Sequence, residues 1–161
     1  MNAQPEKEEI RMRKTFLLAA LVVALANLTT ASLALASGRR TAGAATVTAH
    51  ASRFGKVLFD GQGRTLYLFK RDKGSRSTCS GACAKAWPPF LTRRAPKAGS
   101  GARKSLLGTT KRANGARQVT YAGHPLYYFR GDGKPGQINC QNVVEFGGRW
   151  LVVSPSGAPV R

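Results

Sequence analysis

The sequence predicts a mainly β protein, in which two pseudo-symmetric antiparallel β repeats form one small domain with one or two short helical turns. The main observation is an aromatic segment that occurs twice, as LYLFKRD in Leu66–Asp72 and as LYYFRGD in Leu126–Asp132. Each copy follows a short apolar segment and a glycine-containing turn, which is the pattern of a β-hairpin. Only one alanine-rich segment favours helix, so strands should dominate.

The N-terminal residues predict export. In residues 1–36, basic residues precede an apolar run over 16–26, and small residues follow as far as Ala36. This is the layout of a secretory signal peptide with cleavage near Ala36. A transmembrane anchor is the alternative, but polar residues in the second half of the segment weaken it, and we expect no stable anchor after processing. No cysteine lies at the predicted cleavage site to carry a lipid, so we do not expect a lipoprotein.

The chain left after cleavage is strongly basic, with 22 lysines and arginines against four carboxylates. This excess favours polyanionic partners, such as anionic envelope polymers or lipid headgroups. A solvated surface without a specific partner is the alternative, because the charges are dispersed along the chain. Aromatic residues beside basic ones, as in 127–130, could stack on bases, but core packing explains them better, so no specific nucleic acid is expected.

The first repeat is predicted over residues 55–92 of a domain that spans 55–161, after a flexible lead-in over 37–54. Two segments rich in β-formers, Lys56–Asp60 and Thr65–Phe69, flank a short glycine-containing turn and should form a hairpin. Consecutive side chains of the second segment should point to opposite faces. Both faces are apolar, so both should be buried.

A short helical turn should follow the first hairpin, because an alanine-rich piece precedes Trp87 and Pro88-Pro89 then stops the helix. Trp87 should fill the core. Arginine, proline, glycine and serine then mark a linker over residues 93–104.

The second repeat is predicted over residues 105–157. It combines a strand at 105–110, a turn at Asn114-Gly115, and a second hairpin of Gln118–Tyr121 with Leu126–Phe129. A longer turn over 131–136 and a closing strand at 149–153 complete it.

Three cysteines, Cys79, Cys83 and Cys140, leave several pairings open. One disulfide is the default for an exported protein, either between Cys79 and Cys83 or from one of them to Cys140. Metal or redox chemistry could use these thiols with His50 or His124, but their spacing matches no paired ligand motif. We therefore expect no metal and no cofactor.

Catalytic motifs are not apparent. Asp72 and Asp132 occupy matched positions after their strands, where they could form a paired acid site, although an Asx turn that closes each strand is favoured. The chain has no Gly-x-Ser-x-Gly nucleophile motif. These observations identify no catalytic residue and incline against an enzyme.

These residues together resemble the bacterial secreted-repeat or lipoprotein-repeat family, which has a Tyr-x-(Phe/Trp/Tyr)-x-x-Asp motif. The matching positions are the two motifs, the Cys-x3-Cys-Ala-x2-Trp-Pro-Pro block and the closing tryptophan: Tyr67, Phe69, Asp72, Cys79, Cys83, Trp87, Pro88, Pro89, Tyr127, Phe129, Asp132 and Trp150. The resemblance implies an exported envelope protein of undetermined biochemical role, a Cys79–Cys83 disulfide, and a weak association with alkane catabolism. Cys140 lies outside the common pattern and is a candidate free thiol.

The sequence is therefore interpreted as a secreted or periplasmic cell-envelope protein with a non-catalytic binding or structural role. One alternative is a redox or metal-binding envelope protein that uses Cys79, Cys83 and Cys140. The other is an electrostatic binder of anionic envelope polymers.

Overall fold

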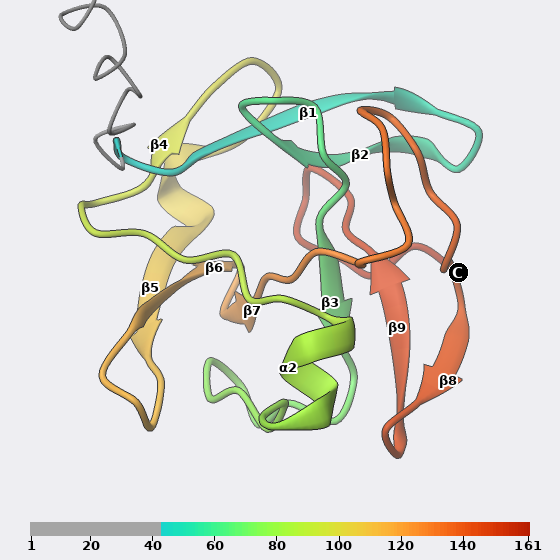
Figure 1. Cartoon of the computed structure of the whole chain (residues 1–161). Helices are drawn as coiled ribbons and strands as arrows, with labels where there is room; N and C mark the ends of the chain where they lie inside the picture. Colours follow the sequence, from blue (N-terminus) through green and yellow to red (C-terminus); the bar gives the residue numbers. More distant parts are fainter. Residues whose placement is uncertain (1–42) are drawn as a thin grey trace, which may run out of the picture. The chain divides into compact units, whose positions relative to one another are not determined.

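The computed structural model describes residues 43–161 (Figure 1). The predicted signal peptide and the first part of the predicted lead-in lie outside the described residues. The elements are, in chain order, β1 (Thr46–Ser52), β2 (Gly55–Asp60), β3 (Tyr67–Phe69), α2 (Ala82–Ala86), β4 (Lys97–Ala98), a 3-10 helix (Lys104–Leu106), β5 (Leu107–Lys111), β6 (Arg117–Tyr121), β7 (His124–Pro125), β8 (Val143–Glu145) and β9 (Gly148–Val152). The prediction of a mainly β fold with short helical turns is confirmed.

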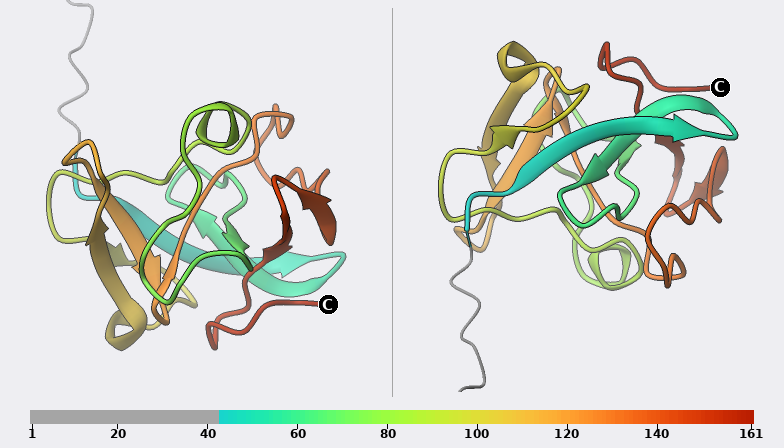
Figure 2. Two further views of the ribbon diagram at one scale, coloured as in Figure 1. Left: turned by 90° about the horizontal axis from the view of Figure 1, so that it is seen from below. Right: turned by 90° about the horizontal axis from the view of Figure 1, so that it is seen from above.

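Residues 43–161 form three three-stranded sheets, with strand orders β2-β1-β4, β3-β9-β8 and β5-β6-β7. All pairs are antiparallel except β1 with β4, which is parallel. In Figure 1 the β1–β2 hairpin crosses the top of the domain, with β5 and β6 below it on one side and β9 and β8 on the other. Figure 2 shows β1 and β2 side by side in both views.

The two repeats use the same sequence of elements. Each begins with a hairpin, β1–β2 in the first repeat and β5–β6 in the second. Each then turns back briefly toward its own hairpin, since the N–H of Leu66 donates to Leu58 O (3.1 Å) and the N–H of Leu126 to Val119 O (3.0 Å). The predicted pairing of Lys56–Asp60 with Thr65–Phe69 is reduced to one bridge between Phe59 and Thr65, because β3 pairs with β9 instead. In the second repeat β6 pairs with β7, so the predicted partner strand at 126–129 does not form.

The strands that follow leave their own repeat. β3 of the first repeat pairs with β9 of the second, which sets Phe69 opposite Trp150. In the same way Tyr127 of the second repeat pairs with Pro89 of the first. At the centre Tyr67 and Tyr127 pair with each other, each N–H donating to the other's carbonyl at 2.9 Å. The repeats are therefore interleaved around the two tyrosines.

The alternation in the motif strands divides the core into two clusters. The sequence predicted that consecutive side chains face opposite sides and are buried, but it did not predict two separate clusters. Leu66 and Leu68 lie in one cluster, while Tyr67 and Phe69 lie in the other, and all four side chains are buried. Trp87 is also fully buried in the second cluster, as expected. The inward positions belong to β-branched, leucine and aromatic residues, whose burial supplies the main driving force for folding.

The predicted lead-in over 37–54 is wrong for Thr46–Ser52, which is β1. This strand pairs with β2 over six residues and buries Val47. The predicted linker over 93–104 is also partly ordered, since Lys97–Ala98 forms β4 beside β1. His124, named above as a possible partner of the thiols, lies in β7 directly after the turn.

Candidate functional site

The two motif tyrosines each bind the aspartate of the other repeat. Tyr67 Oη donates to Asp132 Oδ2 at 2.6 Å, and Tyr127 Oη donates to Asp72 Oδ2 at 2.7 Å. Hydrogen bonds from a hydroxyl to a carboxylate are short and stronger than neutral ones. Each repeat therefore supplies one hydroxyl donor and one carboxylate acceptor, and each donor binds the acceptor of the other repeat.

Each aspartate also closes the loop that follows it. Asp72 Oδ1 accepts from the backbone N–H of Thr78 at 2.7 Å, and Asp132 Oδ1 accepts from that of Asn139 at 3.0 Å. These contacts span six and seven residues, so the closure is wider than the predicted Asx turn. Neither aspartate forms the paired acid site that was weighed as an alternative, because each carboxylate accepts from a tyrosine and a backbone amide instead.

Burial shifts the protonation of these groups. It raises the pKa of Asp72 and of Asp132 above the ordinary aspartate value, while the hydrogen bonds from Tyr127 and Tyr67 partly oppose that rise. Burial also raises the pKa of both tyrosines, and the neighbouring carboxylates add to the effect. The phenols therefore stay protonated and remain donors at neutral pH.

Four aromatic rings stack between the two tyrosines. They follow the order Phe69, Trp150, Trp87, Phe129, with ring centroids 4.1, 3.9 and 4.7 Å apart. Tyr67 meets Trp87 edge-on at 5.3 Å, and Tyr127 meets Trp150 in the same way at 5.2 Å. Such offset and edge-to-face contacts add about 1 kcal/mol per pair beyond burial. The motif aromatics are thus used for packing between the repeats.

The two tryptophans differ in their polar contacts. Trp87 Nε1 donates to Glu145 Oε2 at 2.9 Å, whereas Trp150 Nε1 is buried with no hydrogen-bond partner in the described part of the chain. An unpaired buried N–H is a cost that the packing of the stack must offset.

A disulfide joins Cys79 and Cys83, with Cα atoms 5.3 Å apart, and this is the pair that the family resemblance implies. It lies at the start of α2. Cys140 is a free, half-buried thiol. Burial, with the nearby charges of Asp132 and Glu145, raises the pKa of Cys140 to about 11, so the group is a poor nucleophile at neutral pH.

Within residues 43–161, no group of three or more histidine, cysteine and acidic side chains is arranged to hold a metal ion. The pairing of Cys79 with Cys83 also takes two of the three thiols that the redox or metal alternative needs. In the same part of the chain, no helix has the length and apolarity needed to cross a bilayer.

The described chain has 20 lysines and arginines but only four carboxylates. All four carboxylates accept internal hydrogen bonds: Asp60, Asp72, Asp132 and Glu145. Among residues 43–161 only one ion pair forms, between Arg64 and Asp60 at 2.7 Å. Almost all of the positive charge is therefore left without a protein counter-ion.

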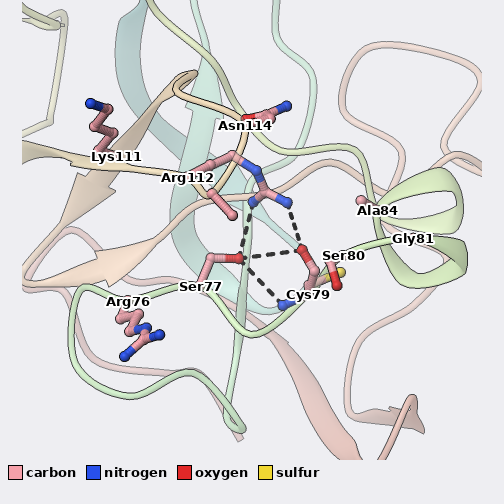
Figure 3. Close-up of a pocket in the computed structure, with 10 residues that line it drawn as sticks. Arg76, Ser77, Cys79, Ser80, Gly81, Ala84, Lys111, Arg112 and Asn114 are labelled. Atoms are coloured by element: carbon pink, nitrogen blue, oxygen red, sulfur yellow. Dashed lines mark hydrogen bonds between the residues drawn. The ribbon is translucent and has the colours of Figure 1, made fainter.

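Part of this charge lines an open cleft of about 560 Å³ beside the disulfide (Figure 3). One wall is the loop that contains Arg76 and Ser77, from the first repeat. The other is formed by Lys111, the last residue of β5, and by Arg112 in the turn that follows, both from the second repeat. The cleft thus forms where the two repeats meet.

Arg112 fixes the two walls of the cleft together. Its Nη1 donates to Ser77 Oγ at 3.0 Å and its Nη2 donates to Cys79 O at 2.6 Å (Figure 3). Nη1 also donates to Gln118 Oε1 at 2.6 Å. Ser77 Oγ in turn lies 2.7 Å from Tyr127 Oη. Because that phenol donates its only hydrogen to a carboxylate, the serine hydroxyl donates to the phenol.

Sequence reasoning identified the motif residues that the structure brings together but missed the polar residues around them. Arg112, Ser77 and Gln118 carry no local pattern that marks them. The single available signal was Gln118, a polar residue inside an otherwise apolar strand, which is fully buried and therefore had to have a partner.

A family model described as a secreted repeat of unknown function matches residues 48–90 and 108–154. The two matched segments begin within β1 and within β5, at equivalent points of the two repeats. The predicted first repeat therefore began too late. Searches among curated proteins and among solved structures found no match.

Proposed function

This chain belongs to the family of secreted repeats of unknown function, and on that premise we propose that it is an exported, non-catalytic component of the cell envelope that binds anionic polymers through its cationic surface. Export would use the signal peptide that ends near Ala36 and would deliver the domain to the periplasm or the cell exterior. A polymer with repeated negative charges is the partner that suits a surface with many dispersed cations.

The observation that carries this proposal is the use of the carboxylates. All four acids of residues 43–161 are hydrogen-bonded internally, and a single arginine is ion-paired. Within residues 43–161, the other cations form no ion pair with an acidic side chain. A solvated surface from an otherwise balanced protein would be expected to mix exposed charges of both signs.

The non-catalytic part of the proposal rests on the motif residues. The tyrosines, aspartates and stacked rings satisfy one another across the repeats, which leaves none of them to act on a substrate. We therefore place the function at the surface and not in the repeated core motif.

Binding of the chain from Ser37 onward to immobilised dextran sulfate tests the proposal, with neutral dextran as the matched control. Retention on the sulfated matrix should be strong at low ionic strength and should weaken steeply as salt rises to about 0.5 M, because screening shortens the reach of exposed charges. Neutral dextran should retain nothing. Absence of retention, or retention that salt does not change, would contradict the proposal.

A further inference from the structure

The cleft beside the disulfide differs from the rest of the cationic surface because its cations are grouped. Arg76, Lys111 and Arg112 line it together with Ser80 and Asn114, and no acidic residue of the described chain lies among its lining residues (Figure 3). Arg76 and Lys111 are exposed and make no side-chain hydrogen bond or ion pair within residues 43–161. Two mobile cations therefore flank one that is held in place.

Arg112 is held only by neutral acceptors. Its three hydrogen-bond partners are a serine hydroxyl, a glutamine amide oxygen and a backbone carbonyl, all of them neutral. Asp72 is the acid whose charge acts on Arg112, but it forms no ion pair with it and accepts from Tyr127 and Thr78 instead. Gln118 is itself fully buried and also donates to Leu126 O at 2.8 Å, so its orientation is fixed. The guanidinium is thus a pre-positioned positive charge in the floor of the cleft, which reduces the ordering cost of binding an anion.

The pseudo-symmetric position provides an internal comparison. A second hollow of about 350 Å³ lies between the β1–β2 turn and the loop over 136–139. It has the same place in the interleaved fold, but Arg53 is its only basic lining residue in the described chain, and Arg53 is committed to Ile138 O at 2.6 Å and to the Phe54 ring. Three cations in the first cleft are therefore a property of that cleft and not a by-product of duplication.

We propose that the cleft formed by Arg76, Lys111 and Arg112 is a binding site for the phosphate groups of an anionic polymer. This inference rests on the proposed function and names the site and the ligand chemistry. A phosphate oxygen can accept from the guanidinium in the floor while the two flexible cations close on the remaining oxygens. The volume falls in the range of small-molecule sites and leaves room for the group that links one phosphate to the next.

Titration of the chain from Ser37 onward with inorganic tripolyphosphate, followed by calorimetry, tests the site. The double variant R76Q/K111Q should bind about tenfold more weakly or worse, because two charge-assisted contacts are lost. The matched control K56Q/R93Q removes the same charge from exposed positions that line no cleft described above, and it should bind as the unmodified chain does. Arg112 is left intact because it also supports the loop.

The titrations distinguish a phosphate site in the cleft from diffuse binding over the cationic surface. Equal weakening in both double variants would overturn the site and leave diffuse binding of polyanions intact. Absence of tripolyphosphate binding together with loss of dextran sulfate retention would overturn both proposals.

Citrate, a tricarboxylate, should bind more weakly than tripolyphosphate, and equal binding would overturn the assignment to phosphate. Binding to phosphatidylglycerol vesicles without any binding of free tripolyphosphate would assign the site to lipid headgroups and overturn the polymer.

Discussion

At the scale of single residues, the repeated motif encodes a link between repeats. Tyr67 and Asp132 are 65 positions apart yet lie 2.6 Å from each other, whereas Asp72, only five positions from Tyr67, serves the other tyrosine. From the sequence alone, an aspartate directly after a strand predicts a turn whose hydrogen bonds stay within that segment. The motif therefore also joins the repeats, because each repeat takes the hydrogen-bond acceptor of its tyrosine hydroxyl from the other repeat.

A double-mutant cycle can measure this exchange. Tyr67→Phe should lower the free energy of unfolding by about 1–3 kcal/mol, since it leaves a carboxylate oxygen without its donor. Combined with Asp132→Asn, the two changes should show a coupling energy, because they remove the same hydrogen bond. Urea unfolding followed by tryptophan fluorescence gives the energies.

The matched control is Tyr67→Phe combined with Asp72→Asn, which lies in the same motif of the sequence. These two changes affect different hydrogen bonds and should be nearly additive. Coupling within the motif, with additivity across the repeats, would show that the tyrosines bind their own aspartates and would refute the interleaved arrangement.

The same aspartates predict a pH dependence of stability. Burial raises the pKa of Asp72 and Asp132, so the folded protein keeps their protons at pH values where the unfolded chain has released them. Their contribution is fully present below about pH 4, the unfolded value, and is lost as the pH rises through the folded pKa values. The free energy of unfolding should therefore fall with rising pH over that window.

Urea unfolding of the parent chain and of Asp132→Asn between pH 3 and pH 7 isolates this effect. The variant has no titrating group at that position, so its curve should fall less steeply than the parent curve. A constant difference between the two curves across the whole range would show that the pKa of Asp132 is the same in the folded and unfolded chain.

At the scale of elements, the sequence predicted strands well where the strands carry their own signal. The aromatic β3 segment is apolar on both faces and is buried as that pattern requires. The matching Leu126–Phe129 segment forms only isolated bridges at Tyr127, and Tyr128 and Phe129 are half-buried. The stop at Pro88 and Pro89 likewise placed α2, because neither residue can donate a backbone hydrogen bond. These features depend on local chemistry.

β1 was missed for the opposite reason. Thr46–Ser52 has the sequence TVTAHAS, with one valine and little other apolar surface, and only Val47 and Ala49 are buried. Its strand conformation comes from the pairing with β2. No residue within the segment predicts that pairing. Strand propensity measures fit to a partner as much as an intrinsic preference.

The cleft could not be predicted from the sequence for the same reason, because it depends on contacts between distant segments. Lys111 ends β5 and Arg112 begins the turn after it, while Arg76 belongs to a loop 35 positions before Lys111. Each is an ordinary surface cation by sequence. They become a group only because the repeats interleave, and the disulfide between Cys79 and Cys83 then orders the loop that carries one wall. A ring that small is expected to organise its loop more than to stabilise the whole fold.

At the scale of the whole molecule, interleaving makes the two repeats one folding unit. β3 finds its partner in β9, and the four-ring stack alternates between the repeats. A fragment with one repeat would expose the edge of its motif strand and half of the stack. Its remaining hairpin would be marginal alone, since two-stranded hairpins are barely stable in water.

Separation of the chain between Arg103 and Lys104, two exposed residues, tests this unity. Residues 43–103 and residues 104–161 should each be unfolded in isolation, because each lacks the partner strand of its motif. Mixed in equal amounts they should associate and recover the folded state, since every exchanged contact is non-covalent. Dispersion of amide signals in NMR spectra of each fragment and of the mixture reports the result.

The control is the intact chain with a protease site inserted at the same junction and cleaved after folding. It should stay folded, because the cut removes no strand pairing and exposed loops tolerate nicking. Cooperative unfolding by either fragment alone would mean that a repeat can satisfy its tyrosine, its aspartate and its tryptophan internally. The exchanged hydrogen bonds would then be a consequence of two independent folds docking, and the cleft between them would be an interface that can open.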